Sequence, residues 1–104
     1  MALLLFLGAA GCSNNVAPQA CRDLVTTVGD KAAECGFDRA VNERVFEENA
    51  TGSRGCGAVA EIRDINGFYD GCIPFFEGLT CAQFDDPTLT LPDSCRMQLQ
   101  RRRR

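Results

Sequence analysis

Residues 18–35 of the chain read PQACRDLVTTVGDKAAEC, and the prediction of the fold starts from this stretch. Its apolar residues recur with the period of an amphipathic helix. Pro18 suits the first turn of a helix, and Gly36 follows where a left-handed C-terminal cap belongs. Gly29 lowers the intrinsic helix propensity, so this helix needs support from packing. The expected inward face consists of Cys21, Leu24, Val25, Val28, Ala32 and Cys35.

A second helical pattern follows directly along the chain. It runs from Asp38, a side chain suited to an N-cap, to Asn49. The period of the pattern separates an apolar edge from a charged one, and we expect the apolar edge to be buried. The expected buried edge is Phe37, Val41, Val45 and Phe46, and the expected solvated edge is Glu43, Arg44, Glu47 and Glu48.

A third helical pattern extends from Gly57 to Phe76. Asn66–Gly67 and Pro74 interrupt it, so we expect two short helices or one kinked helix, ending at Gly78. Residues 79–84, LTCAQF, form a further turn or short helix, and residues 85–95 are mostly irregular. The predicted fold class is therefore all-α, a small disulfide-rich domain of three to four short helices.

The cysteine content indicates an oxidising compartment. The chain has 104 residues with 7 Cys, no Trp and no His, and it lacks the Cys-x-x-Cys or Cys/His clusters typical of metal sites. A core this small gains stability from crosslinks, so we expect disulfides among Cys21, Cys35, Cys56, Cys72, Cys81 and Cys95. Of the many connectivities that six cysteines allow, we favour Cys81–Cys95, which closes the irregular segment, together with Cys35–Cys56 and Cys21–Cys72.

Cys12 is left over from these pairs, and the residues before it suggest its role. The apolar run in MALLLFLGAAGC, residues 1–12, falls far short of the roughly 20 residues that span a bilayer, and it has the composition of a signal peptide. LGAAGC resembles the lipobox of bacterial lipoproteins, with Ala9 where that family most often has Leu. The resemblance implies that Cys12 is lipidated on sulfur and becomes the mature N-terminus. Ser13 implies, by the same resemblance, the outer membrane.

These features divide the chain into four parts. We expect a signal peptide over 1–11, a lipidated N-terminus and tether over 12–19, a disulfide-stapled helical domain over 20–96, and a basic, disordered tail over 97–104. The alternative is ordinary secretion or a periplasmic protein, with Cys12 as a free thiol. The segments GC, LTCAQF and LPDSC between Cys56 and Cys95 also resemble small cysteine-rich lipoproteins of myxobacteria. That resemblance implies a helical fold and a membrane location, but no activity.

Several functions are disfavoured by the residue types present. Without His, the usual general base for a Ser or Cys nucleophile is missing, so we expect no enzyme. Residues 64–71, DINGFYDG, fail as a calcium loop because Ile62 and Ile73 take the first and last ligand positions. We expect no metal and no other cofactor. The net charge of −3 becomes −7 when the four arginines 101–104 are left out, and such an acidic body argues against nucleic acid.

The remaining expectation is a non-catalytic structural or protein-interaction module. Its partners would be a membrane, through the lipid anchor, and an unidentified protein. Arg101–Arg104 would contact anionic lipid or an acidic partner, or would form a solvated end, which we favour. The alternative function is carriage of a small apolar ligand or lipid, although such aromatic residues more commonly fill a core. The candidate pocket residues are Phe68, Tyr69, Phe75, Phe76 and Phe84.

Overall fold

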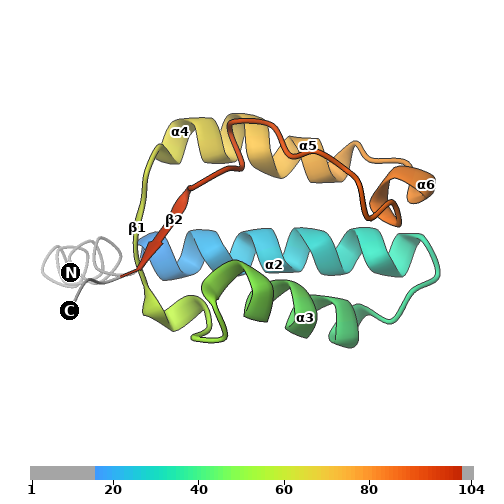
Figure 1. The fold of residues 1–104 in the computed structure, drawn as a ribbon, viewed down its shortest axis with the longest axis horizontal. Coiled ribbons are helices and arrows are strands. Elements are labelled where there is room, and N and C mark those ends of the chain that lie inside the picture. Colours follow the sequence, from blue (N-terminus) through green and yellow to red (C-terminus); the bar gives the residue numbers. More distant parts are fainter. Residues whose placement is uncertain (1–15, 102–104) are drawn as a thin grey trace, which may run out of the picture.

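The computed structural model describes residues 16–101, which form a small helical domain crosslinked by three disulfides (Figure 1). The predicted fold class is confirmed. The elements in chain order are α2 (Val16–Glu34), α3 (Arg39–Thr51), the 3₁₀ turn η1 (Cys56–Ala58), β1 (Val59–Ile62), α4 (Ile65–Gly67), the π-helical turn η2 (Phe68–Cys72), α5 (Ile73–Glu77), α6 (Cys81–Phe84) and β2 (Leu99–Arg101).

The chain passes along one axis four times and reverses its direction between passes. Helix α2 runs outward and α3 returns beside it, as the blue and green ribbons of Figure 1 show. The row from α4 to α5 then runs outward again on the other side of α2, and α6 lies at the far end. The irregular segment 85–98 brings the chain back to β2, which lies beside β1 near the start of α2 (Figure 1).

Helix α2 begins at Val16, so residues 16–19, which were expected to belong to the tether, are helical instead. Local sequence signals set the end of α2 and both ends of α3 close to where they were predicted. Asp38 caps α3, because its side chain accepts a hydrogen bond from the Val41 N–H at 2.8 Å. Gly52, with φ of 63°, ends α3 in the left-handed conformation that glycine adopts without strain. Gly36 likewise has a positive φ of 84°, two residues after the end of α2, where the sequence predicts a left-handed cap.

The helical row from 65 to 77 is more continuous than predicted. Asp64 caps it, and the chain stays helical through Gly67 into the widened turn η2. Of the two expected alternatives, that of two helices separated at Asn66–Gly67 is therefore wrong. The irregularity of the row lies instead in the π turn, which ends at Cys72, two residues before Pro74. Gly78 ends the row as predicted, and α6 follows with a reciprocal capping box between Thr80 and Gln83.

Two expectations fail at the β end of the molecule. Residues 59–62 were expected to be helical but form β1, which pairs antiparallel with β2, Ile62 opposite Leu99. Residues 99–101 were expected to lie in a disordered tail and instead form β2. Val59 and Ile62 are the two buried residues of β1, a pattern that fits a short strand packed on α2 as well as it fits a helix.

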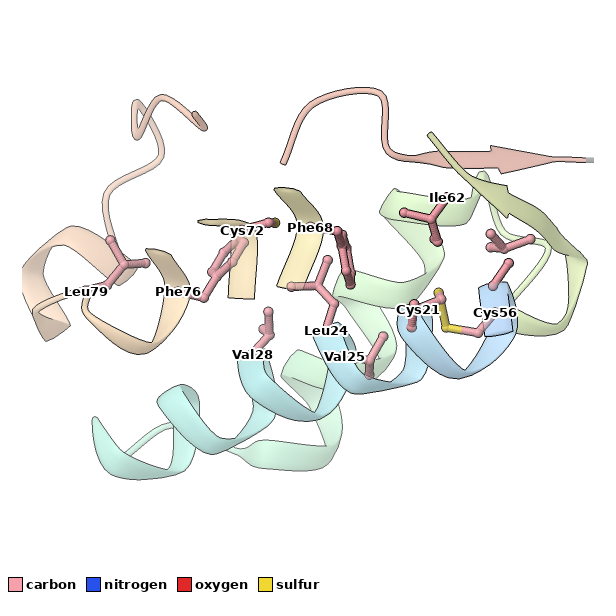
Figure 2. Close-up of a cluster of buried hydrophobic side chains, with 13 residues drawn as sticks. Cys21, Leu24, Val25, Val28, Cys56, Ile62, Phe68, Cys72, Phe76 and Leu79 are labelled. Atoms are coloured by element: carbon pink, nitrogen blue, oxygen red, sulfur yellow. A yellow bond between two sulfur atoms is a disulfide. The ribbon is translucent and has the colours of Figure 1, made fainter. Parts of the chain in front are cut away.

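The core lies between α2 and the row from α4 to α5. Figure 2 shows Leu24 and Val28 of α2 on one side of this layer and Phe68, Cys72 and Phe76 on the other. The predicted inward face of α2 is buried at Cys21, Leu24, Val25, Val28 and Ala32, whereas Cys35 is only half-buried. Packing on this layer supplies the support that the weak intrinsic propensity of α2 requires.

The predicted burial of α3 is wrong for most of its apolar edge. Phe37, Val41 and Val45 are 40–45% exposed, and only Phe46 packs against the core. The helix approaches α2 through a different contact, because Gly29 leaves room for the side chain of Glu43. Amphipathic spacing shows which residues share a face, but it does not show whether another element covers that face.

All six cysteines are disulfide-bonded as expected, but all three predicted pairs are wrong. The structure joins Cys21 to Cys56, Cys35 to Cys81 and Cys72 to Cys95. The pairs Cys21–Cys72, Cys35–Cys56 and Cys81–Cys95 are therefore excluded.

The directions of the helices explain the observed pairing. Cys21 and Cys35 are separated by about 21 Å along α2, given the rise of a helix. Because α3 runs antiparallel to α2, the chain has returned to the start of α2 when it reaches Cys56, which therefore meets Cys21 (Figure 1). The row from α4 to α5 runs outward again, so Cys81 arrives beside Cys35. The returning segment then brings Cys95 to Cys72.

Candidate functional site

An apolar groove follows α3 on the side that faces segment 85–99. Its outer part is a hollow of about 320 Å³ between the first half of α3 and the residues around α6. Val28 and Phe76 lie at its floor, as core residues of α2 and α5. Its walls are formed by Phe37, Asn42, Val45, Phe46 and Asn49 on one side and by Phe84, Asp85, Asp86, Pro87 and Leu89 on the other.

The inner part of the groove is larger and more apolar. It is a hollow of about 510 Å³ between the second half of α3 and the returning segment. Phe46, Asn49 and Phe76 line both parts, so the two hollows form one continuous groove. The other lining residues are Leu24, Ala50, Phe68, Leu91, Cys95, Arg96, Met97, Gln98 and Leu99.

A disulfide and a buried amide help to hold the wall formed by segment 91–99 in place. The Cys72–Cys95 disulfide ties the middle of the segment to η2. Gln98, only 2% exposed, accepts a hydrogen bond from the Asp64 N–H through Oε1 and donates one to the Ser94 carbonyl through Nε2, each at 2.8 Å. The Arg63 N–H also donates a hydrogen bond to the Gln98 carbonyl at 2.9 Å, and Leu99 pairs with Ile62 of β1. The disulfide and the buried amide are therefore two of several contacts that hold this wall.

The outer end of the groove is acidic. Asp85 and Asp86 lie on its wall, and neither forms an ion pair among residues 16–101. Hydrogen bonds from the Thr88 N–H and hydroxyl to Asp86 lower the pKa of its carboxyl, so this side chain is anionic at neutral pH.

Two cations near this end, Lys31 and Arg39, are paired with other groups. Lys31, only 5% exposed, donates a hydrogen bond from Nζ to the Leu79 carbonyl at 2.8 Å and pairs with Glu34. Arg39 pairs with Asp30 at 2.6 Å and with Glu43 at 3.2 Å. Neither Lys31 nor Arg39 pairs with Asp85 or Asp86, and no other ion pair to these two carboxylates is present among residues 16–101.

The structure brings together only some of the aromatic residues proposed for a ligand pocket. Phe76 and Phe84 line the outer hollow, and Phe68 and Phe76 line the inner one. Tyr69 and Phe75 line neither. Sequence reasoning missed Phe46, which links the two hollows, because its spacing marked it only as core, and it missed Gln98 because no local pattern marks a buried amide.

Other predicted features fall outside what the structure describes. Cys12, the signal peptide and Arg102–Arg104 lie outside residues 16–101. Within that range no helix combines the length and the apolar character needed to cross a membrane, and no group of three or more His, Cys, Asp or Glu side chains is arranged to hold a metal ion.

Comparison with known proteins finds no matching family model, no similar curated protein and no similar solved structure.

Proposed function

We propose that this protein is a non-catalytic interaction module, anchored to a bacterial outer membrane through lipidated Cys12, that binds an apolar, basic segment of a partner protein. The groove beside α3 is the proposed docking site. The observation that carries the proposal is the exposed apolar edge of Phe37, Val41 and Val45 next to an open groove with an acidic end. Exposed apolar surface rimmed by polar residues is typical of protein interaction sites.

The depth of the groove favours a protein segment over an enclosed small molecule. Phe68 and Phe76 are almost completely buried at its floor, with 0% and 6% of their surface exposed. Pockets for small ligands bury most of the ligand surface, whereas this groove surrounds an occupant from below and from the two sides only. A helix or extended segment with apolar anchors fits such a shape.

The charge of the groove favours a basic partner. Asp85 and Asp86 lie on its wall, and neither forms an ion pair with another residue of the described range 16–101. A lysine or arginine beside the apolar anchors of a partner would meet these carboxylates, and such complementarity directs binding more than it adds affinity. An acidic segment would be repelled.

The polar residues of the groove support a binding role without catalysis. They are Asn42, Asn49, Asp85, Asp86, Arg96 and Gln98. Gln98 is committed to two backbone hydrogen bonds, and Arg96 pairs with Asp93 at 3.2 Å. This set contains no Ser, Cys or Thr nucleophile with an adjacent base.

Mass spectrometry of protein extracted from its native membrane tests the proposed anchor. The intact mass should correspond to a chain that begins at an acylated Cys12 and has lost six hydrogens to three disulfides. A mature chain that begins elsewhere, or an unmodified Cys12, would contradict the anchor and leave the groove proposal to be tested separately.

A pair of synthetic peptides tests the groove. Both carry Leu and Phe at helical spacing, and the flanking residues are Lys in one and Glu in the other. We expect the Lys peptide to bind at least about tenfold more tightly, because like charges repel the Glu peptide, and Val45→Asn to abolish binding by removing an apolar contact. Val16→Asn is the matched control, since Val16 is a similarly exposed helical valine outside the groove. Equal binding of the two peptides, or binding that survives Val45→Asn, would refute the proposal.

Carriage of an apolar ligand is the second candidate function. The inner hollow of about 510 Å³, lined by Phe68 and Phe76, lies within the size range of small-molecule sites and favours it. A fluorescent fatty acid would then bind with one-to-one stoichiometry and would compete with the Lys peptide. If the fatty acid does not bind while the peptide does, the carrier function is excluded.

A further inference from the structure

We infer that the Cys35–Cys81 disulfide is a site of thiol–disulfide exchange, at which a dithiol reductant releases the outer wall of the groove. This inference rests on the proposed function, because it assigns a regulation to the same groove. The oxidised protein is the form that selects a basic partner segment. Reduction of this one disulfide displaces the wall that carries Asp85 and Asp86.

The three disulfides differ in how far solvent reaches them. The members of Cys21–Cys56 are 1% and 2% exposed, and Cys72–Cys95 has one member that is fully buried in the core. In Cys35–Cys81 neither member is buried, because Cys81 is exposed at the start of α6 and Cys35 is half-buried directly after α2. A thiolate must reach a sulfur to open a disulfide, so access favours exchange at Cys35–Cys81.

Helix α6 has few contacts besides this disulfide. None of its four residues is buried, and the hydrogen bonds of residues 80–86 run within the stretch that ends at Leu89. Phe84 is half-buried and stacks on Phe37, with 6.1 Å between the ring centroids. Phe37 is itself 40% exposed. Cys35–Cys81 is therefore the one covalent link in a weakly packed part of the domain.

The disulfide joins the two walls of the outer hollow at their far end. Cys35 lies in the turn that leads from α2 into α3, and α3 carries one wall (Figure 1). Cys81 begins α6, and the other wall, residues 84–87 and Leu89, follows directly. Breaking the disulfide frees this second wall, whereas the α3 wall keeps its close approach to α2 at Gly29.

Anchors on both sides of α6 remain after reduction. Before α6, Leu79 is 6% exposed in the core, and its carbonyl accepts a hydrogen bond from Lys31 Nζ at 2.8 Å. After the wall, Cys95 stays bonded to buried Cys72. Reduction therefore displaces the residues between these anchors and leaves the core layer in place, which is what a reversible device requires.

The exchange needs a dithiol and no other co-reactant. One thiolate of the reductant attacks Sγ of Cys81, forms a mixed disulfide and expels Cys35 as a thiolate, which takes a proton from water. The second thiolate of the reductant then attacks its own sulfur in the mixed disulfide and expels Cys81, which is protonated in turn. The protein has gained two electrons and two protons, and the dithiol has become a disulfide.

Differential alkylation of the full-length chain carrying Cys12→Ser identifies the disulfide that opens first. Dithiothreitol, the dithiol used as a probe, is added in limiting amount to the folded protein, and the alkylated cysteines are located by mass spectrometry. We expect Cys35 and Cys81 to be labelled at least about tenfold faster than the other four cysteines. Earlier labelling of either other pair, or equal labelling of all six, would overturn the inference.

Hydrogen exchange measures the release of the wall. In the oxidised protein the N–H groups of Phe84 and Asp85 donate hydrogen bonds to the Thr80 and Cys81 carbonyls. In the variant Cys35→Ser with Cys81→Ser we expect these two N–H groups to exchange at least about tenfold faster. The Asp64 N–H, which donates to buried Gln98, should keep its rate. Unchanged exchange at residues 84 and 85 would contradict the release.

Peptide binding separates this inference from the proposed function. We expect the oxidised protein to prefer the Lys peptide and the variant Cys35→Ser with Cys81→Ser to bind both peptides alike, because Asp85 and Asp86 have moved away. A variant that keeps the preference of the oxidised protein would overturn the inference. If the oxidised protein binds neither peptide, the proposed function fails, while alkylation and hydrogen exchange still decide whether Cys35–Cys81 controls the wall.

Discussion

At the residue scale, two polar side chains link parts of the chain that are distant in sequence. Gln98 joins the returning segment to the start of α4, and Tyr69 joins η2 to α2 through Asp23. Gln98 is buried, so water cannot take over its hydrogen bonds when the side chain is removed. Tyr69, by contrast, is 40% exposed. Their removal should therefore have different consequences.

We predict that Gln98→Met destabilises the protein by about 2 kcal/mol, because the Asp64 N–H and the Ser94 carbonyl lose a buried partner while the side chain keeps its length. Denaturant unfolding with the disulfides intact measures this change. Gln19→Ala is the control, since its hydrogen bond to Asp23 is exposed, and it should shift stability by no more than about 0.5 kcal/mol. A similar loss in both variants would contradict the role assigned to Gln98.

The surroundings of Tyr69 predict the pKa of its phenol, which can be measured directly. Burial, followed by the hydrogen bond to Asp23 and its charge, raises the pKa of this phenol from 10.0 to about 12. Tyr69 is the single tyrosine of the chain and there is no Trp, so phenolate absorbance reports it alone. The raised pKa contributes stability that is complete below pH 10 and is lost as the pH rises toward about 12.

We expect Asp23→Asn to bring the titration midpoint of Tyr69 part of the way back toward its ordinary value, because the contribution of burial remains. Asp70→Asn, which changes an exposed carboxylate next to Tyr69 in sequence, should not move it. A titration near pH 10 in the unmodified protein would show that the phenol is not held against Asp23.

At the element scale, the contact between α2 and α3 explains why a glycine stands in the middle of a helix. A methyl group on Gly29 would overlap the side chain of Glu43. Alanine is favoured over glycine inside a helix by about 1 kcal/mol, so the close approach of α3 opposes the intrinsic preference of α2. Glu43 is also the partner of Arg39, through an ion pair at the surface that contributes little.

The close contact between Gly29 and Glu43 predicts that the effect of Gly29→Ala on stability depends on the residue at position 43. Gly29→Ala alone should bring no gain, because the side chain of Glu43 must be displaced. In a Glu43→Ala background the same change should raise the free energy of unfolding by up to about 1 kcal/mol. A double-mutant cycle measured by denaturant unfolding checks it, and equal effects in both backgrounds would exclude the contact.

The sequence predicts elements well where caps define them and poorly where distant partners define them. Asp38, Gly36 and Gly78 marked real helix ends because capping is a local interaction. Strand β1 was missed because its partner, β2, lies 37 residues further along the chain and no local pattern links them. The groove was missed for the same reason, since one wall is an irregular segment positioned by Cys72–Cys95.

At the scale of the whole molecule, the alternation of helix direction fixes the disulfide pattern. This disulfide pattern predicts a distinct set of linked peptides after tryptic digestion without reduction. The peptide that ends at Arg22 should be joined to 55–63 through Cys21–Cys56, and 32–39 to 64–96 through Cys35–Cys81. Chymotryptic cleavage after Phe76 and Phe84 then isolates the Cys72–Cys95 link. A link between 32–39 and 55–63 would exclude the antiparallel arrangement of α2 and α3.

The three disulfides also differ in which parts of the structure they hold. Their effect on peptide binding can therefore be measured separately from their effect on stability. Cys72–Cys95 and Cys21–Cys56 close loops of comparable length, with separations of 23 and 35 residues, so each should contribute about 3–4 kcal/mol by restricting the unfolded chain. Only Cys72–Cys95 anchors a wall of the groove, because Cys95 lines the inner hollow. Replacing both members of either pair by alanine should therefore lower stability similarly.

Peptide binding should respond differently to the two replacements. Under conditions where both variants remain folded by circular dichroism, we expect loss of Lys-peptide binding without Cys72–Cys95 and retention without Cys21–Cys56. The first change releases the segment that forms one side of the groove, whereas the second acts at the β end. If both variants bind the peptide as the unmodified protein does, the partner docks on the exposed edge of α3 alone, and the returning segment is only structural.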